Sequence, residues 1–275
     1  ELIGWGAISG MVAGEDGIVY AVNDSFYGYK PTIFTIDTTV SPAQITKALP
    51  VTRGGYAAQK LDLEGITLDG DGGFWLASEG RTDRMIPHGI YHINKNGEIE
   101  EEISLPAGLL AVENRFGFEG ITLIDGTLWM AVQREWADDP ADHVKLVAYD
   151  IATGEWGAVL YPKAAAQTGW VGLSEIVAHA GAVYVIERDN QIGDNAAVKR
   201  IYRISGDQMV PAALGGELPV VTKEAVYDLI PDLKTGRGYV VDKVEGLAIF
   251  ADGTAWASTD NDGVDDSSGE TFFWS

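Results

Sequence analysis

Polar residues that could bind a metal ion or a substrate recur at matching positions in five segments of the sequence. Each segment has a polar residue where a first apolar run begins, and these residues are Ser9, Glu64, Glu119, Ser174 and Glu245. Each segment has another polar residue just after a second apolar run, and these are Asp24, Glu79, Gln133, Arg188 and Asp260. Carboxylates crowded into one narrow place raise each other's pKa or bind a cation. Because neither His nor Cys accompanies them, their oxygens favour a hard ion, Ca²⁺ or alternatively Mg²⁺.

We therefore predict a metal site built from carboxylates of these segments, and the predicted ligands are Asp24, Glu64, Glu119, Glu175 and Glu245. Glu175 is included because it directly follows Ser174, where the fourth segment lacks the expected glutamate. A competing hypothesis is that each Glu-Gly pair is a turn device. The glycine would then relieve backbone crowding at the start of a strand, and the glutamate would accept backbone N–H bonds. Three Glu-Gly pairs at equivalent positions favour metal binding.

Six basic residues flank the same segments, although the whole chain has only 19. They are Lys60, Arg81, Arg115, Arg134, Arg188 and Lys243. Arginine binds phosphate or carboxylate with two parallel hydrogen bonds. We predict that four of them bind an anionic substrate, namely Lys60, Arg115, Arg134 and Lys243. The predicted catalytic residues are Arg188 and a general base, Glu79 or Asp260, between which the sequence does not choose. The alternative is that each basic residue pairs with a neighbouring carboxylate.

The elements that must position these residues form an internal repeat. The residues of the first set are separated by 55, 55, 55 and 71 positions. Each segment reads as two apolar strands joined by a turn, often Asp-Gly, which is typical of a β-hairpin. The second strand always carries an aromatic residue, and these residues are Tyr20, Trp75, Trp129, Tyr184 and Trp256. Such a repeat is typical of a β-propeller.

Further strand-like runs lie between the segments, and PTIFTID, GIYHINKNGEIEEEISL, KLVAYDIATGEWGAVLY and KRIYRISGDQMVPA each suggest a second hairpin. Two hairpins per repeat predict an all-β propeller of four-stranded blades, formed by residues 1–275 as one domain. Five blades are favoured, with the N-terminal ELIGW strand closing the last one, and six are the alternative. The 71-residue interval is expected to hold a short helix or an extended insertion at KEAVYDLIPDL. In a propeller blade, the first strand begins and the second ends on the same face, so the predicted site residues should meet at one mouth of the central channel.

The composition narrows the classes of function. The net charge of −22 opposes binding to nucleic acid and to anionic membranes, and it attracts cations. No apolar run approaches the roughly 18 residues that a membrane span needs, so no membrane insertion is expected. The chain has no cysteine, which excludes disulfides and thiolate metal sites. No Gly-x-Ser-x-Gly elbow or phosphate-binding glycine loop is present.

Four stretches resemble the bacterial family known as esterase-like activity of phytase, a family of phytase-like β-propellers. They are LEGITLDGDGGFWLASEG, NRFGFEGITL, the triplet Glu187-Arg188-Asp189, and KVEGLAIFADGTAWASTDND. The resemblance implies a secreted or periplasmic protein and a metal-dependent hydrolase of phosphate esters or other esters. The chain departs from the pattern at Ser9-Gly10 and at Ser174-Glu175, which reduces the ring of glutamates to three.

Two hypotheses of function follow. In the first, Ca²⁺ held by the glutamates assists hydrolysis of a small anionic or ester substrate. In the second, the propeller is a non-catalytic binding or structural module of a larger extracellular protein, because a fold does not fix a function. Turnover of phosphate-ester, ester and lactone substrates, or its absence, separates the two.

Overall fold

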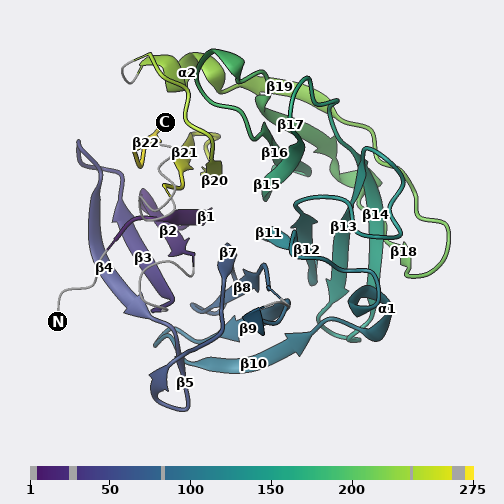
Figure 1. Cartoon of the computed structure of the whole chain (residues 1–275). Helices are drawn as coiled ribbons and strands as arrows, with labels where there is room; N and C mark the ends of the chain where they lie inside the picture. Colours follow the sequence, from purple (N-terminus) through teal and green to yellow (C-terminus); the bar gives the residue numbers. More distant parts are fainter. Residues whose placement is uncertain (1–4, 25–29, 82–83, 236–237, 262–269) are drawn as a thin grey trace.

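The computed structural model describes residues 5–24, 30–81, 84–235, 238–261 and 270–275. Five small antiparallel sheets are arranged around a common axis as the blades of a β-propeller (Figure 1). The innermost strands of neighbouring blades contact one another around the axis, and contacts between the first and last blades close the ring. The prediction of an all-β propeller with five blades is confirmed, and the six-bladed alternative is wrong.

The blades follow one another along the chain. Blade one consists of β1 (Ile8–Ala13), β2 (Ile18–Asn23), β3 (Thr32–Asp37) and β4 (Gln44–Pro50). Blade two consists of β7 (Leu63–Leu68), β8 (Phe74–Ser78), β9 (Gly89–Ile93) and β10 (Ile99–Ser104). Blade three consists of β11 (Phe118–Ile124), β12 (Thr127–Val132), β13 (His143–Asp150), β14 (Trp156–Pro162) and β18 (Ala212–Ala213).

Blade four consists of β15 (Val171–His179), β16 (Ala182–Asp189), β17 (Lys199–Ser205) and β19 (Glu224–Asp228). Blade five consists of β20 (Val244–Ile249), β21 (Ala255–Thr259) and β22 (Phe273–Trp274). A small hairpin pairs β5 (Thr52–Arg53) with β6 (Tyr56–Ala57). The described α-helices are short, namely α1 (Ala107–Leu110) and α2 (Ile230–Thr235). None of the helices in the described part has the length and apolar character needed to cross a membrane.

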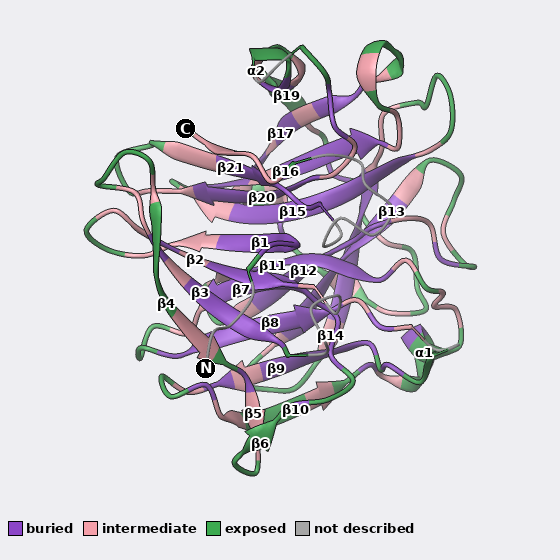
Figure 2. Ribbon diagram, turned by 60° about the vertical axis from the view of Figure 1, so that its left-hand side comes forward, coloured by how far each residue is buried: buried purple, intermediate pink, exposed green. Residues whose placement is uncertain are grey.

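The core lies between the blades, where the apolar faces of adjacent sheets pack. The repeated aromatic residue of the second strand fills this space: Trp129 is only 1% exposed, and Tyr20 packs edge-on against Phe74 of the next blade. Figure 2 shows the inner strands buried, whereas the outermost strands β4 and β10 are largely exposed. The run IEEEIS of β10 explains this difference, because its three glutamates have no place in a core.

Blade four departs from the expected pair of hairpins. The segment KRIYRISGDQMVPA supplies β17, but the chain then leaves the blade, and β18 pairs with β14 of blade three. The fourth strand is β19, which belongs to the stretch expected to be a helix or an insertion, and α2 follows it. The expectation of a second hairpin within that segment is therefore wrong.

The expected N-terminal closing strand falls partly on residues 1–4, outside the described residues. Trp5 follows them without strand structure and lines a pocket together with Ile8 and Phe273. Three strands of blade five lie within the described ranges.

Candidate catalytic site at the channel mouth

A β-bulge marks the start of the innermost strand in every blade. The register shifts between Leu63 and Gly65 in β7, and the other four inner strands shift at the equivalent position. The bulges contain the residues that the sequence singled out, namely Ser9, Glu64, Glu119, Ser174 and Glu245. A bulge turns its extra residue out of the ladder. The repeated polar position is therefore a backbone feature that aims one side chain per blade towards the mouth of the channel.

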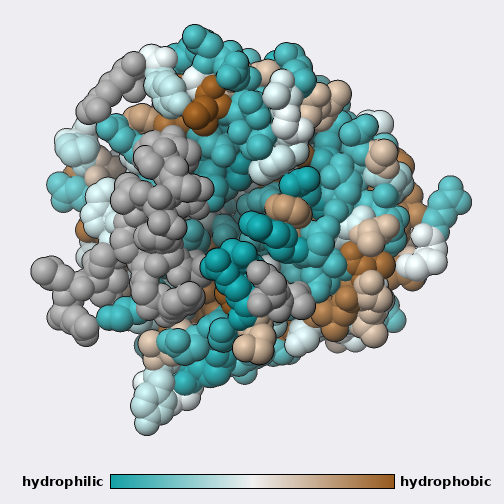
Figure 3. All heavy atoms as spheres, viewed as in Figure 1, coloured by the Kyte–Doolittle hydropathy of each residue, from teal (hydrophilic) through white to brown (hydrophobic). Residues whose placement is uncertain are grey.

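The ends of the second strands lie at the same mouth, as predicted. The amide of Glu79 donates to the carbonyl of Asp62, at 2.9 Å, directly before the bulge of β7. Equivalent bonds join Asp24 to Ala7, Gln133 to Gly117 and Asp260 to Lys243. In blade four, Arg188 pairs with Gly172 at this level. Figure 3, viewed along the propeller axis, shows mainly hydrophilic residues around the centre of this side.

Three carboxylates at the mouth lie close enough to hold one cation. Ligand oxygens of Asp62, Glu64 and Glu79 all lie within 4.8 Å of one another. Asp62 and Glu64 are buried, and Glu79 is half-buried. An all-oxygen set of this kind fits a hard divalent cation such as Ca²⁺ or Mg²⁺. We call Asp62, Glu64 and Glu79 the carboxylate cluster.

Burial and mutual repulsion make the charged forms of the cluster's glutamates unfavourable. Burial raises the pKa of Glu64 well above its usual range, and the negative charges of Glu119 and Asp62 raise it further. Burial and the charge of Asp62 raise the pKa of Glu79 to about 8. A hydrogen bond between Glu79 and Glu119 opposes that rise, and such a bond between carboxyl groups requires one of them to be protonated. A bound cation would take over the role of that proton.

Glu119 and Glu245 lie beside the carboxylate cluster with partners of their own. Glu119 Oε1 accepts a hydrogen bond from Gln133 Nε2 at 2.6 Å. Glu245 Oε1 pairs with Arg188 Nη2 at 2.6 Å, in a buried contact. Burial and the charges of Glu79 and Glu245 raise the pKa of Glu119 well above its usual range. Glu245 is thus neutralised by arginine, whereas Glu119 directly borders the cluster.

Glu175 lies away from the carboxylate cluster, on the propeller axis. Its Oε2 accepts the amide of Met11 and its Oε1 the amide of Ile176, both at 3.0 Å, and the amide of Leu247 also donates to it. It is fully buried, and burial raises the pKa of its carboxyl well above the usual range. The structure therefore gives Glu175 a set of backbone donors from blades one, four and five.

Glycines at the equivalent positions of the other blades make room on the axis. A Cβ atom on Gly65 would lie 2.7 Å from the amide nitrogen of Ile121, and one on Gly120 would collide with the carboxylate of Glu175. The glycine of each Glu-Gly pair thus permits close approach of the inner strands, which agrees with the hypothesis that glycine relieves backbone crowding at the start of a strand. The glutamate of each pair faces the mouth.

The remaining predicted ligand and base lie at the same mouth outside the carboxylate cluster. Asp24 is half-buried after β2, and Asp260 is buried with its Oδ2 3.4 Å from the Nζ of Lys243. Neither belongs to the group of three converging carboxylates among the described residues.

The predicted substrate-binding residues differ in their surroundings. Lys60 donates its Nζ to the carbonyl of Arg84 at 3.0 Å on the exposed surface. Burial raises the pKa of Glu119 and of Glu79, and the positive charges of Lys243 and Arg115, respectively, partly oppose that rise. Arg134 stacks against aromatic rings. Of the four, Arg115 and Lys243 therefore act electrostatically on carboxylates of the mouth.

Sequence reasoning missed Asp62. The signal was present, because Asp62 lies two residues before Glu64, just as Lys243 lies two residues before Glu245. This position has no common residue type in the five segments, because it is occupied by Ala7, Asp62, Gly117, Gly172 and Lys243. The bulge geometry shows that this position borders the strand-end residues in each blade.

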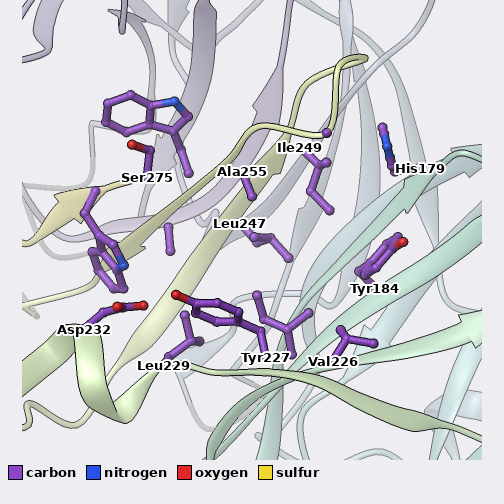
Figure 4. A pocket seen from close by; sticks show the side chains of 15 residues that line it. His179, Tyr184, Val226, Tyr227, Leu229, Asp232, Leu247, Ile249, Ala255 and Ser275 are labelled. Atoms are coloured by element: carbon purple, nitrogen blue, oxygen red, sulfur yellow. The ribbon is translucent and has the colours of Figure 1, made fainter.

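A separate pocket lies between blades four and five, with a volume of about 420 Å³. Figure 4 shows apolar and aromatic side chains around it, among them Tyr184, Tyr227 and Leu247. Among the described residues that line it, Asp232 is the one acidic side chain, and it is hydrogen-bonded to Tyr227. None of the predicted site residues lines this pocket, so the chemistry indicated by the sequence lies at the channel mouth.

The fold and this site define a five-bladed β-propeller with a carboxylate-rich, partly buried mouth. A family model described as esterase-like activity of phytase matches residues 3–263. The chain belongs to this family, as the resemblance of its motifs indicated. No curated protein matches the sequence significantly.

Solved structures share the fold at low sequence identity. Glutaminyl cyclase of Myxococcus xanthus is similar with a TM-score of 0.55 and 12% identity, over 93% of this chain and 86% of that one. A GH43 protein of Bacillus licheniformis, BlXynB, is similar with a TM-score of 0.52 and 12% identity, over 92% of this chain and 48% of that one. At these identities the similarity establishes the propeller architecture alone.

Proposed function

We propose that this protein is a metal-dependent hydrolase that cleaves a small ester or phosphate ester at the channel mouth. The observation that carries the proposal is the convergence of Asp62, Glu64 and Glu79 within 4.8 Å. Membership of an esterase-like family supports hydrolysis as the reaction class. Extracellular calcium modules bind Ca²⁺ with modest affinity, and a secreted or periplasmic location suits such a site.

The carboxylate cluster would hold Ca²⁺, or Mg²⁺ as the alternative. Bound there, the ion would supply Lewis acidity and a more acidic water molecule. Glu119 is the carboxylate that we assign as general base, because it is hydrogen-bonded to Glu79 and to Gln133 at the edge of the cluster. Asp260 is less suited to that role, since its Oδ2 forms an ion pair with Lys243 Nζ at 3.4 Å. Arg115 and Lys243 provide positive charge where negative charge develops on the substrate.

The test measures binding and turnover separately. Ca²⁺ is titrated into metal-free protein by calorimetry, and hydrolysis of p-nitrophenyl phosphate and p-nitrophenyl acetate is followed with and without EDTA. We expect Glu64→Gln to weaken Ca²⁺ binding at least about tenfold, because it removes one charged ligand from a set of three. Turnover should fall in parallel and should return when Ca²⁺ or Mg²⁺ is added to the EDTA-treated wild type.

Glu155→Gln is the matched control, because Glu155 is an exposed residue of a loop in blade three. Hydrolysis that survives both EDTA and Glu64→Gln would contradict the metal-dependent reaction. Absence of turnover across phosphate-ester, ester and lactone substrates, in folded and metal-loaded protein, would favour a non-catalytic binding or structural module of a larger extracellular protein.

A further inference from the structure

Three arginines and two aromatic rings alternate beside the carboxylate cluster. The guanidinium of Arg115 lies 5.1 Å from the ring centre of Phe116, and that of Arg134 lies 4.1 Å from the same ring. Arg134 is also 4.9 Å from the ring centre of Trp170, which Arg188 approaches to 5.2 Å. We call these five residues the arginine ladder. It runs from exposed Arg115 to buried Arg188.

Among the described residues, no carboxylate forms an ion pair with Arg134, the middle arginine of the ladder. The nearby acid is Glu135, but its Oε1 pairs with Lys163 Nζ at 2.8 Å. The Nε of Arg134 is buried and has no hydrogen-bond partner among the described residues. Burial and the positive charge of Arg115 lower the pKa of Arg134. The protein has a net charge of −22, yet the described part of the chain provides Arg134 with no ion-pair partner.

The aromatic rings of the ladder are held by hydrogen bonds of their backbone. The amide of Trp170 donates to Asn190 Oδ1 at 3.1 Å. The amide of Phe116 donates to Asn114 Oδ1 at 2.9 Å, and its carbonyl accepts Trp136 Nε1 at 2.8 Å. Contacts with ring faces hold the guanidinium of Arg134 in place without satisfying its buried Nε–H, which has no partner among the described residues. Arg134 is therefore prepared for a ligand that accepts hydrogen bonds.

The two ends of the ladder connect it to the chemistry of the mouth. Arg188 is already paired, with Glu245 at 2.6 Å and with Asp242 at 3.2 Å. Arg115 is exposed, and it lies two residues before Gly117, on which a Cβ would collide with the carbonyl oxygen of Glu79. Arg134, whose buried Nε has no partner among the described residues, thus lies in a ladder whose ends reach Glu245 and the strand end at Glu79.

We propose that Arg134 and Arg115 bind an oxoanion, a phosphate or a carboxylate group of the substrate, and that the preferred substrate is an anionic ester. This inference rests on the proposed hydrolase function, and it names the substrate class. Two guanidiniums present forked donors that match the oxygens of either group. The strongly negative remainder of the protein restricts the ligand to a small molecule, because it would repel a polyanion.

The test begins with binding in the absence of metal. Inorganic phosphate and succinate are titrated by calorimetry into EDTA-treated wild type, Arg134→Gln, Arg134→Lys and Arg53→Gln. Arg53→Gln is the matched control, because Arg53 forms an exposed ion pair with Glu102 far along the chain from the ladder. We expect Arg134→Gln to bind the preferred anion about 10- to 100-fold more weakly, and Arg134→Lys to lie between it and the wild type. The stronger of the two ligands identifies phosphate or carboxylate as the group recognised.

Kinetics then test the substrate class. The specificity constant kcat/KM is compared for p-nitrophenyl phosphate, mono-4-nitrophenyl succinate and neutral p-nitrophenyl acetate. Arg134→Gln should lower it about 10- to 100-fold for the preferred anionic ester, mainly through KM, and leave the neutral ester unchanged. If Arg134→Gln does not fold, the metal-free anion titrations are repeated on Arg115→Gln, at an exposed position, which should bind the preferred anion more weakly than the wild type and the Arg53→Gln control.

The outcomes separate this inference from the proposed function. Equal binding of both anions to wild type and Arg134→Gln, or binding to neither protein, overturns the oxoanion site. Metal-dependent turnover that is unchanged by Arg134→Gln for all three esters also overturns it, and leaves the hydrolase proposal in place. Anion binding that requires Arg134 in a protein without turnover retains the site and refutes the hydrolase.

Discussion

Glu175 offers the sharpest test of how the inner strands are held together. Its carboxylate accepts amides from Met11 of blade one, Ile176 of blade four and Leu247 of blade five. Glu175→Ala removes the acceptor from three buried N–H groups. An unsatisfied buried N–H costs about 1–3 kcal/mol. Water entering the vacated space would accept hydrogen bonds from some of these N–H groups. The variant also no longer bears the cost of burying the carboxyl group, which offsets part of the loss. We therefore expect a net loss of about 2–4 kcal/mol.

The assay is urea and thermal unfolding of the wild type, Glu175→Ala and the control Glu155→Ala. For a chain of this size, 2–4 kcal/mol corresponds to a Tm lower by roughly 4–8 °C. The control removes an exposed glutamate and should stay within about 0.5 kcal/mol of the wild type. If Glu175→Ala unfolds at the same denaturant concentration as Glu155→Ala, the carboxylate does not hold the three blades together and the reasoning fails.

The pH dependence of Glu175→Gln gives an independent check. Burial places the folded-state pKa of Glu175 well above the reference value of 4.5. The folded protein therefore keeps a proton that the unfolded chain releases above that pH. The stability contributed by this group is complete below pH 4.5 and is lost as the pH rises towards the folded-state pKa. Glutamine cannot lose a proton, so the stability of Glu175→Gln relative to the wild type should increase over that interval. A difference that stays constant with pH would contradict the assigned direction of the pKa shift.

Two further predictions concern the packing around the axis and the buried charges of blade four. Gly65→Ala places a Cβ 2.7 Å from the backbone of the neighbouring inner strand, and it should lower the free energy of unfolding in urea by about 1–3 kcal/mol. A Cβ on the control, Gly108→Ala, meets open space and should cost nothing measurable. Equal stability of the two variants would contradict the close approach of the inner strands. Lys199→Met removes the ammonium group that forms a buried ion pair with Asp189 at 3.1 Å. We expect this change to destabilise the protein by about 3–5 kcal/mol in urea unfolding. A loss below about 1 kcal/mol would show that this ion pair contributes little.

The fold was predictable because the repeat is local and strongly patterned. Two apolar runs, a turn and an aromatic residue recur with a nearly constant spacing, and each part has a direct structural meaning. Blade four was mispredicted beyond its third strand because β18 and β19 are set by tertiary pairing. The two-residue strand β18 is stabilised by β14 of the preceding blade, and no periodicity in so short a stretch could reveal that partner.

The candidate site was predictable as a region but not as a set of contacts. The columns of the repeat correctly placed Glu64, Glu119 and Glu79 at one mouth, because equivalent positions of a propeller share a face. Which carboxylates converge depends on side-chain geometry, and the structure shows that Asp62 converges with Glu64 and Glu79. Which cations remain free depends on competing partners. Glu135 forms its ion pair with Lys163, and among the described residues none is formed between Glu135 and its neighbour Arg134.

The irregular fourth blade explains why a nearly symmetric ring has one asymmetric centre. There, Ser-Glu replaces Glu-Gly, so the bulge residue is Ser174 and the next residue carries the carboxylate. Ser174 accepts Arg188 Nε at 3.0 Å, and the arginine reaches Glu245 of blade five. The displaced carboxylate fills the axis, where the other blades have glycine. Two changes in this blade, Ser174 at the bulge and Arg188 at the end of the second strand, thus remove one negative charge from the mouth and supply a cation that neutralises Glu245.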